Sequence, residues 1–177
     1  MKNKIIITGL SNINKLELAK ELIKLNDNLS ICPMFTSDQN YSGIINENYK
    51  YYLPTNIINL SYKNNSIFFI KTENFISTGV TVDDYYNNDI IFCNIDEYNN
   101  ISEKYFNEDN ILTIWLDTKS HKDIININNE INDTKYLLDR LENKKYMYFI
   151  DKNIEDISKI IIKYITTNNE NILNEYN

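Results

Sequence analysis

A glycine and a lysine six residues apart follow the first apolar segment of the chain. Gly9 ends the run "IIITG", and Lys15 opens a stretch with apolar residues at helical spacing. This is the spacing of a phosphate-binding loop, G-x-x-x-x-G-K-[ST], in which backbone N–H groups at a helix N-terminus and a lysine hold an anion. The match is degenerate, because Asn14 stands at the second glycine and Leu16 at the hydroxyl residue.

The turn alone leaves two interpretations open. Asparagine tolerates a left-handed backbone better than other non-glycine residues, so Asn14 could preserve the loop shape, and Ser11 could add a hydroxyl. Leu16 cannot bind magnesium, and Glu17 is a poor substitute because its carboxylate would repel phosphate. The other interpretation is an ordinary strand-turn-helix that happens to contain Gly9 and Lys15.

A second candidate lies farther along the chain, where the apolar strand expected at 89–96 ends in Asp96 and Glu97. Ligands of open parallel sheets bind at the carboxyl ends of strands, so Asp96 is expected at the same edge as Gly9 and Lys15. It could bind a metal, directly or through water, or accept from the N–H groups of a base. It could equally be a helix N-cap.

The elements that must position these residues alternate between apolar strands and helical stretches. This alternation predicts an α/β fold with a parallel sheet covered on both faces. The strands are expected at 5–8, 30–35, 49–53, 67–71, 89–96, 111–116 and 146–150, and the helices at 15–25, 81–86, 120–143 and 154–165. A β-rich segment, 36–88, interrupts the alternation. The tail, 167–177, is rich in asparagine and is expected to fray.

The length and composition of the chain exclude several classes of protein. A length of 177 residues suggests one domain, and a net charge of −7 argues against binding to nucleic acid or to an anionic membrane. No signal peptide and no run of about 20 apolar residues is present, so we expect a soluble, cytoplasmic protein. Cys32 and Cys93 lack metal-ligand spacing and are expected as buried free thiols.

The chain contains 31 asparagines, 31 isoleucines and a single arginine, Arg140. Such usage indicates an AT-rich genome, either viral, from a phage, or from a low-GC bacterium. His121 and Trp115 are expected as a solvated residue and a core residue, not as ligands.

The order of these pieces resembles the guanylate kinase family of P-loop nucleoside monophosphate kinases. The segment "GLSNINKLE" is similar to the family's "GPSGVGKGT", "NYKY" to "DYxF", and "TGVT" to "YGTS". The segment "CNIDEYN" is similar to "DIDVQG", "LLDRL" to "IxxRL", and "YMYFIDKN" to "YDYVIVND". Each motif is weak, but their order and spacing agree along nearly the whole chain.

The resemblance implies a single domain of P-loop NTPase type, a parallel sheet flanked by helices. It implies a core at 1–35 and 89–166, an inserted monophosphate-binding segment at 36–88, a helical lid at 118–142 and the tail at 167–177. It further implies ATP and Mg²⁺ as cofactors and a nucleoside monophosphate as the acceptor.

Individual roles follow from the same resemblance. The ATP phosphates would be held by Gly9, Ser11, Asn12, Asn14 and Lys15. The acceptor would be contacted by Tyr49 at its phosphate and by Thr81 and Asp96 at its base, and Arg140 in the lid would reach the transferring phosphoryl group together with Lys15.

The departures from the family pattern concern charge. The family's acceptor loop reads "TTRxPRxG", whereas this chain has "MFTSDQNYSG", without arginine or lysine. Lysine supplies charge but not the bidentate fork that fits phosphate, and Arg140 is the only arginine. We therefore carry three hypotheses: a nucleoside monophosphate kinase of weak activity, an inactive member of the fold that binds a protein partner, and a P-loop kinase with a different acceptor.

Overall fold

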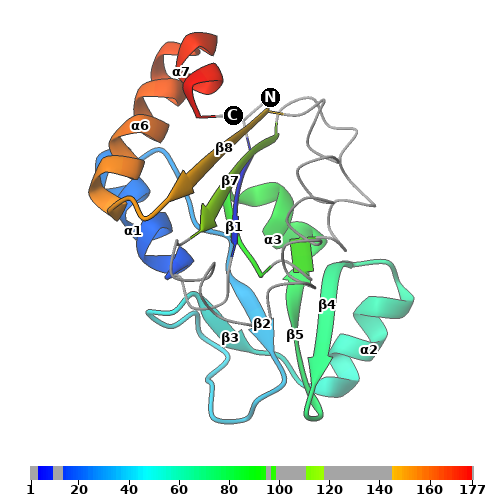
Figure 1. The fold of residues 1–177 in the computed structure, drawn as a ribbon. Helices are drawn as coiled ribbons and strands as arrows, with labels where there is room; N and C mark the ends of the chain where they lie inside the picture. The colour runs from blue at the N-terminus through cyan, green and yellow to red at the C-terminus, as the bar shows by residue number, and fades with distance from the viewer. Residues whose placement is uncertain (1–3, 10–13, 95–96, 99–110, 118–144, 177) are drawn as a thin grey trace, which may run out of the picture.

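The computed structural model describes residues 4–9, 14–94, 97–98, 111–117 and 145–176. These residues form two four-stranded sheets with helices around them (Figure 1). The lid-like segment 118–142, with His121 and Arg140, lies outside the described residues, as do Ser11, Asn12 and Asp96.

The first sheet is entirely parallel and follows the order β6-β1-β7-β8. Its strands are β1 (Lys4–Gly9), β6 (Ile90–Phe92), β7 (Ile111–Asp117) and β8 (Lys145–Ile150). Every residue of β1 is buried, as expected of a strand covered on both faces. The neighbouring strands β1 and β6 therefore end at the same edge, β1 at Gly9 and β6 just before Cys93.

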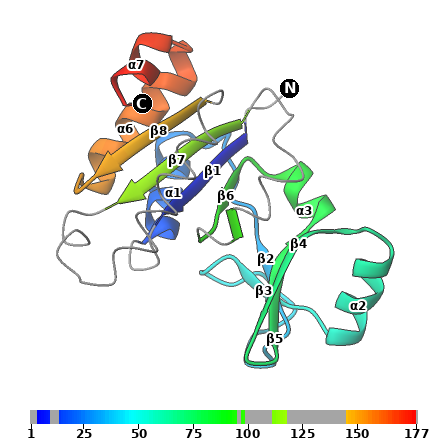
Figure 2. The ribbon, with the colours of Figure 1, turned by 45° about the vertical axis from the view of Figure 1, so that its right-hand side comes forward.

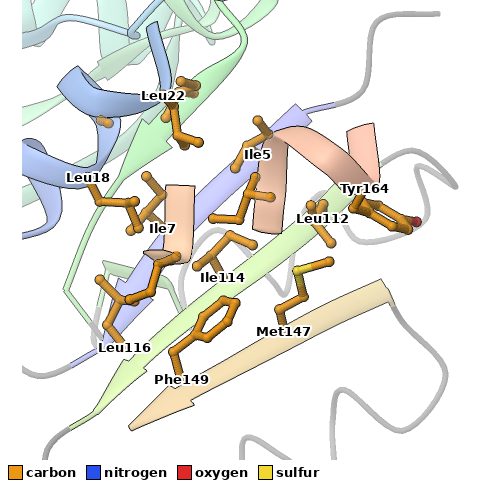
Figure 3. Close-up of a cluster of buried hydrophobic side chains, with 14 of the residues drawn as sticks. Ile5, Ile7, Leu18, Leu22, Leu112, Ile114, Leu116, Met147, Phe149 and Tyr164 are labelled. Atoms are coloured by element: carbon orange, nitrogen blue, oxygen red, sulfur yellow. The ribbon is translucent and has the colours of Figure 1, made fainter. Parts of the chain in front are cut away.

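Two long helices cover one face of this sheet. They are α1 (Lys15–Leu25) and α6 (Ile154–Thr167), and they pack against each other. Figure 3 shows the layer between the helices and the strands. Its buried side chains include Ile5, Ile7, Leu18, Leu22, Leu112, Ile114, Leu116, Met147, Phe149, Ile157, Ile161 and Tyr164. Their continuous packing fixes the direction in which α1 leaves the end of β1.

The second sheet is mixed and follows the order β3-β2-β5-β4. Its strands are β2 (Met34–Thr36), β3 (Lys50–Tyr52), β4 (Ile67–Glu73) and β5 (Ile76–Thr81). Helices α2 (Thr55–Lys63) and α3 (Val82–Asn87) belong to the same part of the chain, which lies beside the first sheet in Figure 2.

One buried cluster joins the two sheets. Ile6 and Trp115 of the first sheet share it with Phe68 and Val80 of the second and with Tyr85 of α3. The rings of Phe68 and Tyr85 stack with centroids 3.8 Å apart. Trp115 is therefore a core residue, as expected. Cys32 and Cys93 are both buried and free, also as expected.

The structure corrects the expected elements at several places. The tail is not frayed in 170–175, because these residues form α7 (Glu170–Glu175), which buries Ile172 and Leu173. Helix α2 and strand β5 were not expected. The strand expected at 89–96 stops at Phe92, and that expected at 30–35 is reduced to β2 and a single bridge at Ile31. For the tail, the polar residue pattern is outweighed by the packing of Ile172 and Leu173 into the core layer.

Candidate functional site

Gly9 ends β1 with a backbone that other residues rarely adopt. Its φ is +133°, and a Cβ added to it would lie 2.0 Å from the carbonyl oxygen of Leu116 on β7. A side chain is therefore excluded both by conformation and by space. The glycine that the sequence pattern singled out is required here for the close approach of β1 to β7, and this requirement holds with or without a ligand.

Asn14 begins α1 as its N-cap. Its side-chain oxygen accepts a hydrogen bond from the N–H of Glu17 at 3.1 Å, and its φ is −77°. Asn14 therefore does not adopt the left-handed backbone by which it could have replaced a glycine. A capping asparagine needs no such conformation, because its own side chain satisfies an N–H group of the first turn. One of the amides that a phosphate could use is occupied by Asn14.

Lys15, the first residue of α1, turns inward. Its side chain is only 6% exposed, and Nζ donates to the carbonyl oxygen of Gly9 over a long 3.4 Å. Burial lowers the pKa of Lys15, while Cys93 and Glu97 act in the opposite direction. The lysine is thus held at the carboxyl end of β1, beside the N-terminus of α1.

The chain after β6 brings an acid to the same corner. The N–H of Cys93 donates to the carbonyl oxygen of Ile7 at 3.0 Å, which holds this segment beside β1. Three residues later Glu97 folds back, and its Oε2 accepts from the N–H of Asn94 at 2.8 Å. Glu97 is 7% exposed and lies close enough to Lys15 to favour the charged ammonium. Gly9, Asn14, Lys15, Cys93 and Glu97 are called the Lys15 corner below.

Sequence reasoning named Asp96 as the acid of this edge and noted Glu97 only as its neighbour. Asp96 lies outside the described residues, whereas Glu97 is described and favours the charged form of Lys15, so it acts against the lowering of the Lys15 pKa by burial. The sequence contains a pattern that predicts this position of the Glu97 side chain. The spacing Asn94-x-x-Glu97 is that of a capping box, in which the second side chain returns to the N–H of the first residue.

Thr8, which precedes Gly9, and Cys93 of the corner are both buried. The hydroxyl of Thr8 is buried beside the Cys93 thiol, a weak hydrogen-bonding group. The Cys93 thiol is buried, and burial raises its pKa far above the ordinary value of a thiol. Cys93 therefore stays protonated and is not a ready nucleophile.

Thr81 lies at the end of β5 in the second sheet, and its hydroxyl stabilises the start of α3. Its hydroxyl accepts from the N–H of Asp84 at 3.1 Å, as the N-cap of α3, and donates to Asp84 Oδ2 at 2.6 Å. The hydroxyl of Tyr51 donates to the same oxygen at 2.8 Å. Burial and this hydrogen bond raise the pKa of Tyr51. We call Tyr51, Thr81 and Asp84 the Asp84 cluster; sequence reasoning did not single out Tyr51 or Asp84 as partners of Thr81.

Tyr49 is separate from that cluster. It has a φ of 55°, its N–H donates to Asn46, and its carbonyl oxygen accepts from Met34 at 2.8 Å. Its ring packs against the core layer beneath α1 and α6. Of the residues expected at the site, the structure brings Gly9, Asn14 and Lys15 together and places Tyr49 and Thr81 in the segment of the second sheet.

The corner can hold an anion through a buried cation and a helix N-terminus, two features that favour negative charge. Within the described ranges, no three histidine, cysteine, aspartate or glutamate side chains gather as a metal site. No helix in the described part of the chain is long and apolar enough to cross a membrane.

Comparisons with known proteins agree with this architecture. No family model and no curated protein sequence matches the chain. Among solved structures, the chain is similar to a guanylate kinase from Anaplasma phagocytophilum, with a TM-score of 0.61 and 12% sequence identity. The match covers 94% of this chain and 86% of that chain. The parallel sheet flanked by helices, with its second mixed sheet, is thus a P-loop kinase-like α/β fold of the kind found in that guanylate kinase.

Proposed function

We propose that the chain is a guanylate kinase-like nucleoside monophosphate kinase of weak activity, which transfers a phosphoryl group from ATP to a (deoxy)nucleoside monophosphate. The observation that carries the proposal is the burial of Lys15 between the end of β1 and the start of α1. A lysine is seldom buried unless a negative group interacts with its charge, because the transfer of an ammonium group from water into the protein interior is costly. Here it lies where an open parallel sheet binds ligands.

The phosphates of ATP would be held by Lys15 and by the turn that carries Gly9, Ser11, Asn12 and Asn14. Magnesium would neutralise the phosphate charge that develops during transfer. The residues present fit this ion in part. Leu16 offers no oxygen, whereas Glu97 offers a buried carboxylate oxygen for a hard cation.

The acceptor half of the proposal rests on the resemblance in sequence. Tyr49 would contact the acceptor phosphate, Asp96 the base, and Arg140 the transferring group. The hydroxyl of Thr81 would have to leave Asp84 before it could contact a base, so Thr81 is the weakest of these assignments.

A second candidate is an inactive member of the fold that binds a protein partner. It is favoured by Asn14, whose side chain occupies the N–H of Glu17 at the helix N-terminus. It is also favoured by the stretch "MFTSDQNYSG", which has no basic residue to bind an acceptor phosphate. The two candidates differ in whether ATP stabilises the folded protein, since a ligand that binds only the folded state raises the melting temperature.

The test combines a melting experiment with an assay for ADP. The protein is melted with ATP, with each nucleoside monophosphate and with both, in the presence and absence of magnesium, and ADP formation is measured under the same conditions. Lys15→Met keeps the length of the side chain and removes the charge. Lys20→Met, on a less buried part of the same helix, is the matched control.

We expect ATP to raise the melting temperature of the wild type and of Lys20→Met, and not that of Lys15→Met. ADP formation that requires Lys15 and one monophosphate would establish the kinase. Stabilisation by ATP without ADP formation would leave a nucleotide-binding module. An unchanged melting temperature with every nucleotide would reject nucleotide binding and favour the protein-binding candidate.

A further inference from the structure

The outer strands of the two described sheets differ in how their free edges are covered. An outer strand presents N–H and C=O groups that no neighbouring strand uses. In β3, β6 and β8, other segments of the chain bind such groups. Tyr52 of β3 donates to Ser42 at 2.6 Å, Ile90 of β6 accepts from Cys32 at 2.8 Å, and Tyr148 of β8 donates to Tyr176 at 2.7 Å.

β4 is the remaining outer strand of the described sheets, and its register places Thr72 opposite Ser77 of β5. The backbone groups of Ser77 point away from β4, because its N–H donates to Ser37 Oγ and its C=O accepts from the Ser37 N–H, each at 2.8 Å. The N–H and C=O of Thr72 therefore point to the outer edge, as do those of Ile70 two residues earlier. Within the described part of the chain, neither Thr72 nor Ile70 has a backbone hydrogen bond to a segment outside the hairpin.

This edge is accessible from solvent. Thr72 and Glu73 are exposed, and Phe75 in the turn that follows has a fully exposed side chain. Helix α2 packs through Ile58 against Phe35 of the inner strand β2, so this helix covers a face of the sheet. Figure 2 shows the β4–β5 hairpin extending away from the first sheet. A strand of another molecule can therefore reach the outer groups of Thr72.

The charges on either side of Thr72 are complementary to themselves. Lys71 Nζ and Glu73 Oε1 form an ion pair at 2.8 Å, which places both side chains on one face of the strand. If two copies of β4 pair antiparallel about a two-fold axis at Thr72, Lys71 of each copy lies opposite Glu73 of the other. The register with Ile70 opposite Thr72 would instead place the two Lys71 side chains opposite each other, and like charges in that position are destabilising.

We propose that the outer edge of β4 binds β4 of a second copy of this chain, so that the two mixed sheets continue into each other. The two Thr72 residues exchange N–H···O=C hydrogen bonds, and a pair of opposite charges lies on either side of them. A two-fold interface uses the same edge on both copies, so assembly stops at the dimer. The contact is small, so the dimer forms only at high protein concentration. This inference does not depend on the proposed kinase activity.

The experiment measures the sedimentation coefficient of the whole chain at protein concentrations from about 10 μM to about 1 mM, the range for a weak interface. We expect the wild type to change from monomer to dimer over this range. Lys71→Glu and Glu73→Lys each place like charges opposite each other and should weaken the dimer by about tenfold or more. An equimolar mixture of these two variants should dimerise as the wild type does, because every facing pair again has opposite charges. Lys159→Glu, an exposed change on α6, is the control and should leave the dimer unchanged.

A second pair of variants tests the backbone contact. Thr72→Pro removes the N–H that points outward and keeps the bonds between β4 and β5, since proline is tolerated at the free edge of an outer strand. Thr72→Val loses the same hydroxyl and keeps the N–H, so it should dimerise while Thr72→Pro stays monomeric. Thermal melting shows that each variant is folded, and the Thr72 variants decide if a charge variant does not fold. A wild type that is monomeric at every concentration overturns the inference, as does a dimer of wild-type strength in folded Thr72→Pro or in both charge variants.

Discussion

The Lys15 corner and the Asp84 cluster each contain an acid, buried at Glu97 and half-buried at Asp84, but the two acids have different hydrogen-bond partners. Asp84 accepts two short hydrogen bonds, from Tyr51 at 2.8 Å and from Thr81 at 2.6 Å, and the Thr81 hydroxyl in turn caps α3. In the Lys15 corner Lys15 Nζ donates to the Gly9 carbonyl oxygen over a long 3.4 Å, and the buried Thr8 hydroxyl lies beside the Cys93 thiol, a weak hydrogen-bonding group.

The difference indicates which polar group serves the fold and which serves a ligand. Polar groups that satisfy one another lower the free energy of the folded state and need nothing further. Buried polar groups with long or weak hydrogen bonds lower the stability of the folded state. Such groups are common at binding sites, where a ligand supplies the missing hydrogen bond or charge. By this criterion the Asp84 cluster is structural, and the Lys15 corner remains the candidate site.

The largest expected effect concerns the backbone of the corner. Gly9→Ala would bring a Cβ within 2.0 Å of the Leu116 carbonyl oxygen at a φ of +133°. We expect a loss of at least about 4 kcal/mol in the free energy of unfolding, measured by urea denaturation.

Gly43→Ala is the control for that change, because a Cβ at Gly43 would meet no atom within 4 Å. Its stability should change by less than about 1 kcal/mol. Equal stability of Gly9→Ala and the wild type would show that β1 and β7 are not in the contact described.

The next effect concerns the buried charges. Lys15→Met leaves Glu97 without its nearby cation and should lower the free energy of unfolding by about 2 kcal/mol. Adding Glu97→Gln to the same protein should recover most of that loss, since no charge then remains to be compensated. Urea denaturation of both single variants and of the double variant gives the coupling. Additive effects would mean that the two charges do not interact.

A smaller effect is expected from the Asp84 cluster. Asp84→Ala leaves the hydroxyls of Tyr51 and Thr81 without their acceptor and should cost about 1.5 kcal/mol of stability. The affinity for ATP, where it binds, should stay that of the wild type. A weaker affinity in a fully folded Asp84→Ala protein would break the distinction between the two regions.

The smallest effect is a dependence on pH. Burial and the hydrogen bond to Asp84 raise the pKa of Tyr51 above its ordinary value of 10.0. The folded protein therefore keeps the proton at pH values where the unfolded chain has lost it, so the stability from Tyr51 is complete below pH 10 and falls as the pH rises through the folded pKa.

Tyr51→Phe should accordingly be about 1 kcal/mol less stable than the wild type at pH 8, and the difference should shrink above pH 10. Thermal melting of the two proteins across this range measures it. A difference that stays constant up to pH 11 would mean that the Tyr51 proton is not held by the fold.

Much of the fold could be predicted from residue patterns, because its elements follow strong local rules. The β-branched run of β1 and the helical spacing of α1 gave both elements almost to the residue. Helix α2 was missed although its apolar residues have helical spacing, because the whole segment 36–88 was expected to be rich in strands. The tail was misjudged because Ile172 and Leu173 become apolar contacts only once β8 and α6 are in place.

The site was predicted less completely than the fold. Gly9 and Lys15 were found from their spacing, and the structure adds the reason for each. The sequence pointed to Asp96 and not to Glu97, because the position of Glu97 depends on the turn after β6 and on the pairing of β6 with β1. Thr81 was assigned to a ligand from its motif, and only the structure shows that Asp84 already occupies its hydroxyl.

The last helix also has a consequence for how the protein behaves at high concentration. β8 is an outer strand of the first sheet among the described strands, and such a strand presents unpaired N–H and C=O groups to other molecules. Here the N–H of Tyr148 donates to the carbonyl oxygen of Tyr176 at 2.7 Å, just after α7. The C-terminal segment, which the sequence predicted to be frayed, thus covers part of the outer edge of β8 and hinders the pairing of this strand with a strand of another molecule. Removal of residues 170–176 should therefore promote aggregation before it unfolds the protein.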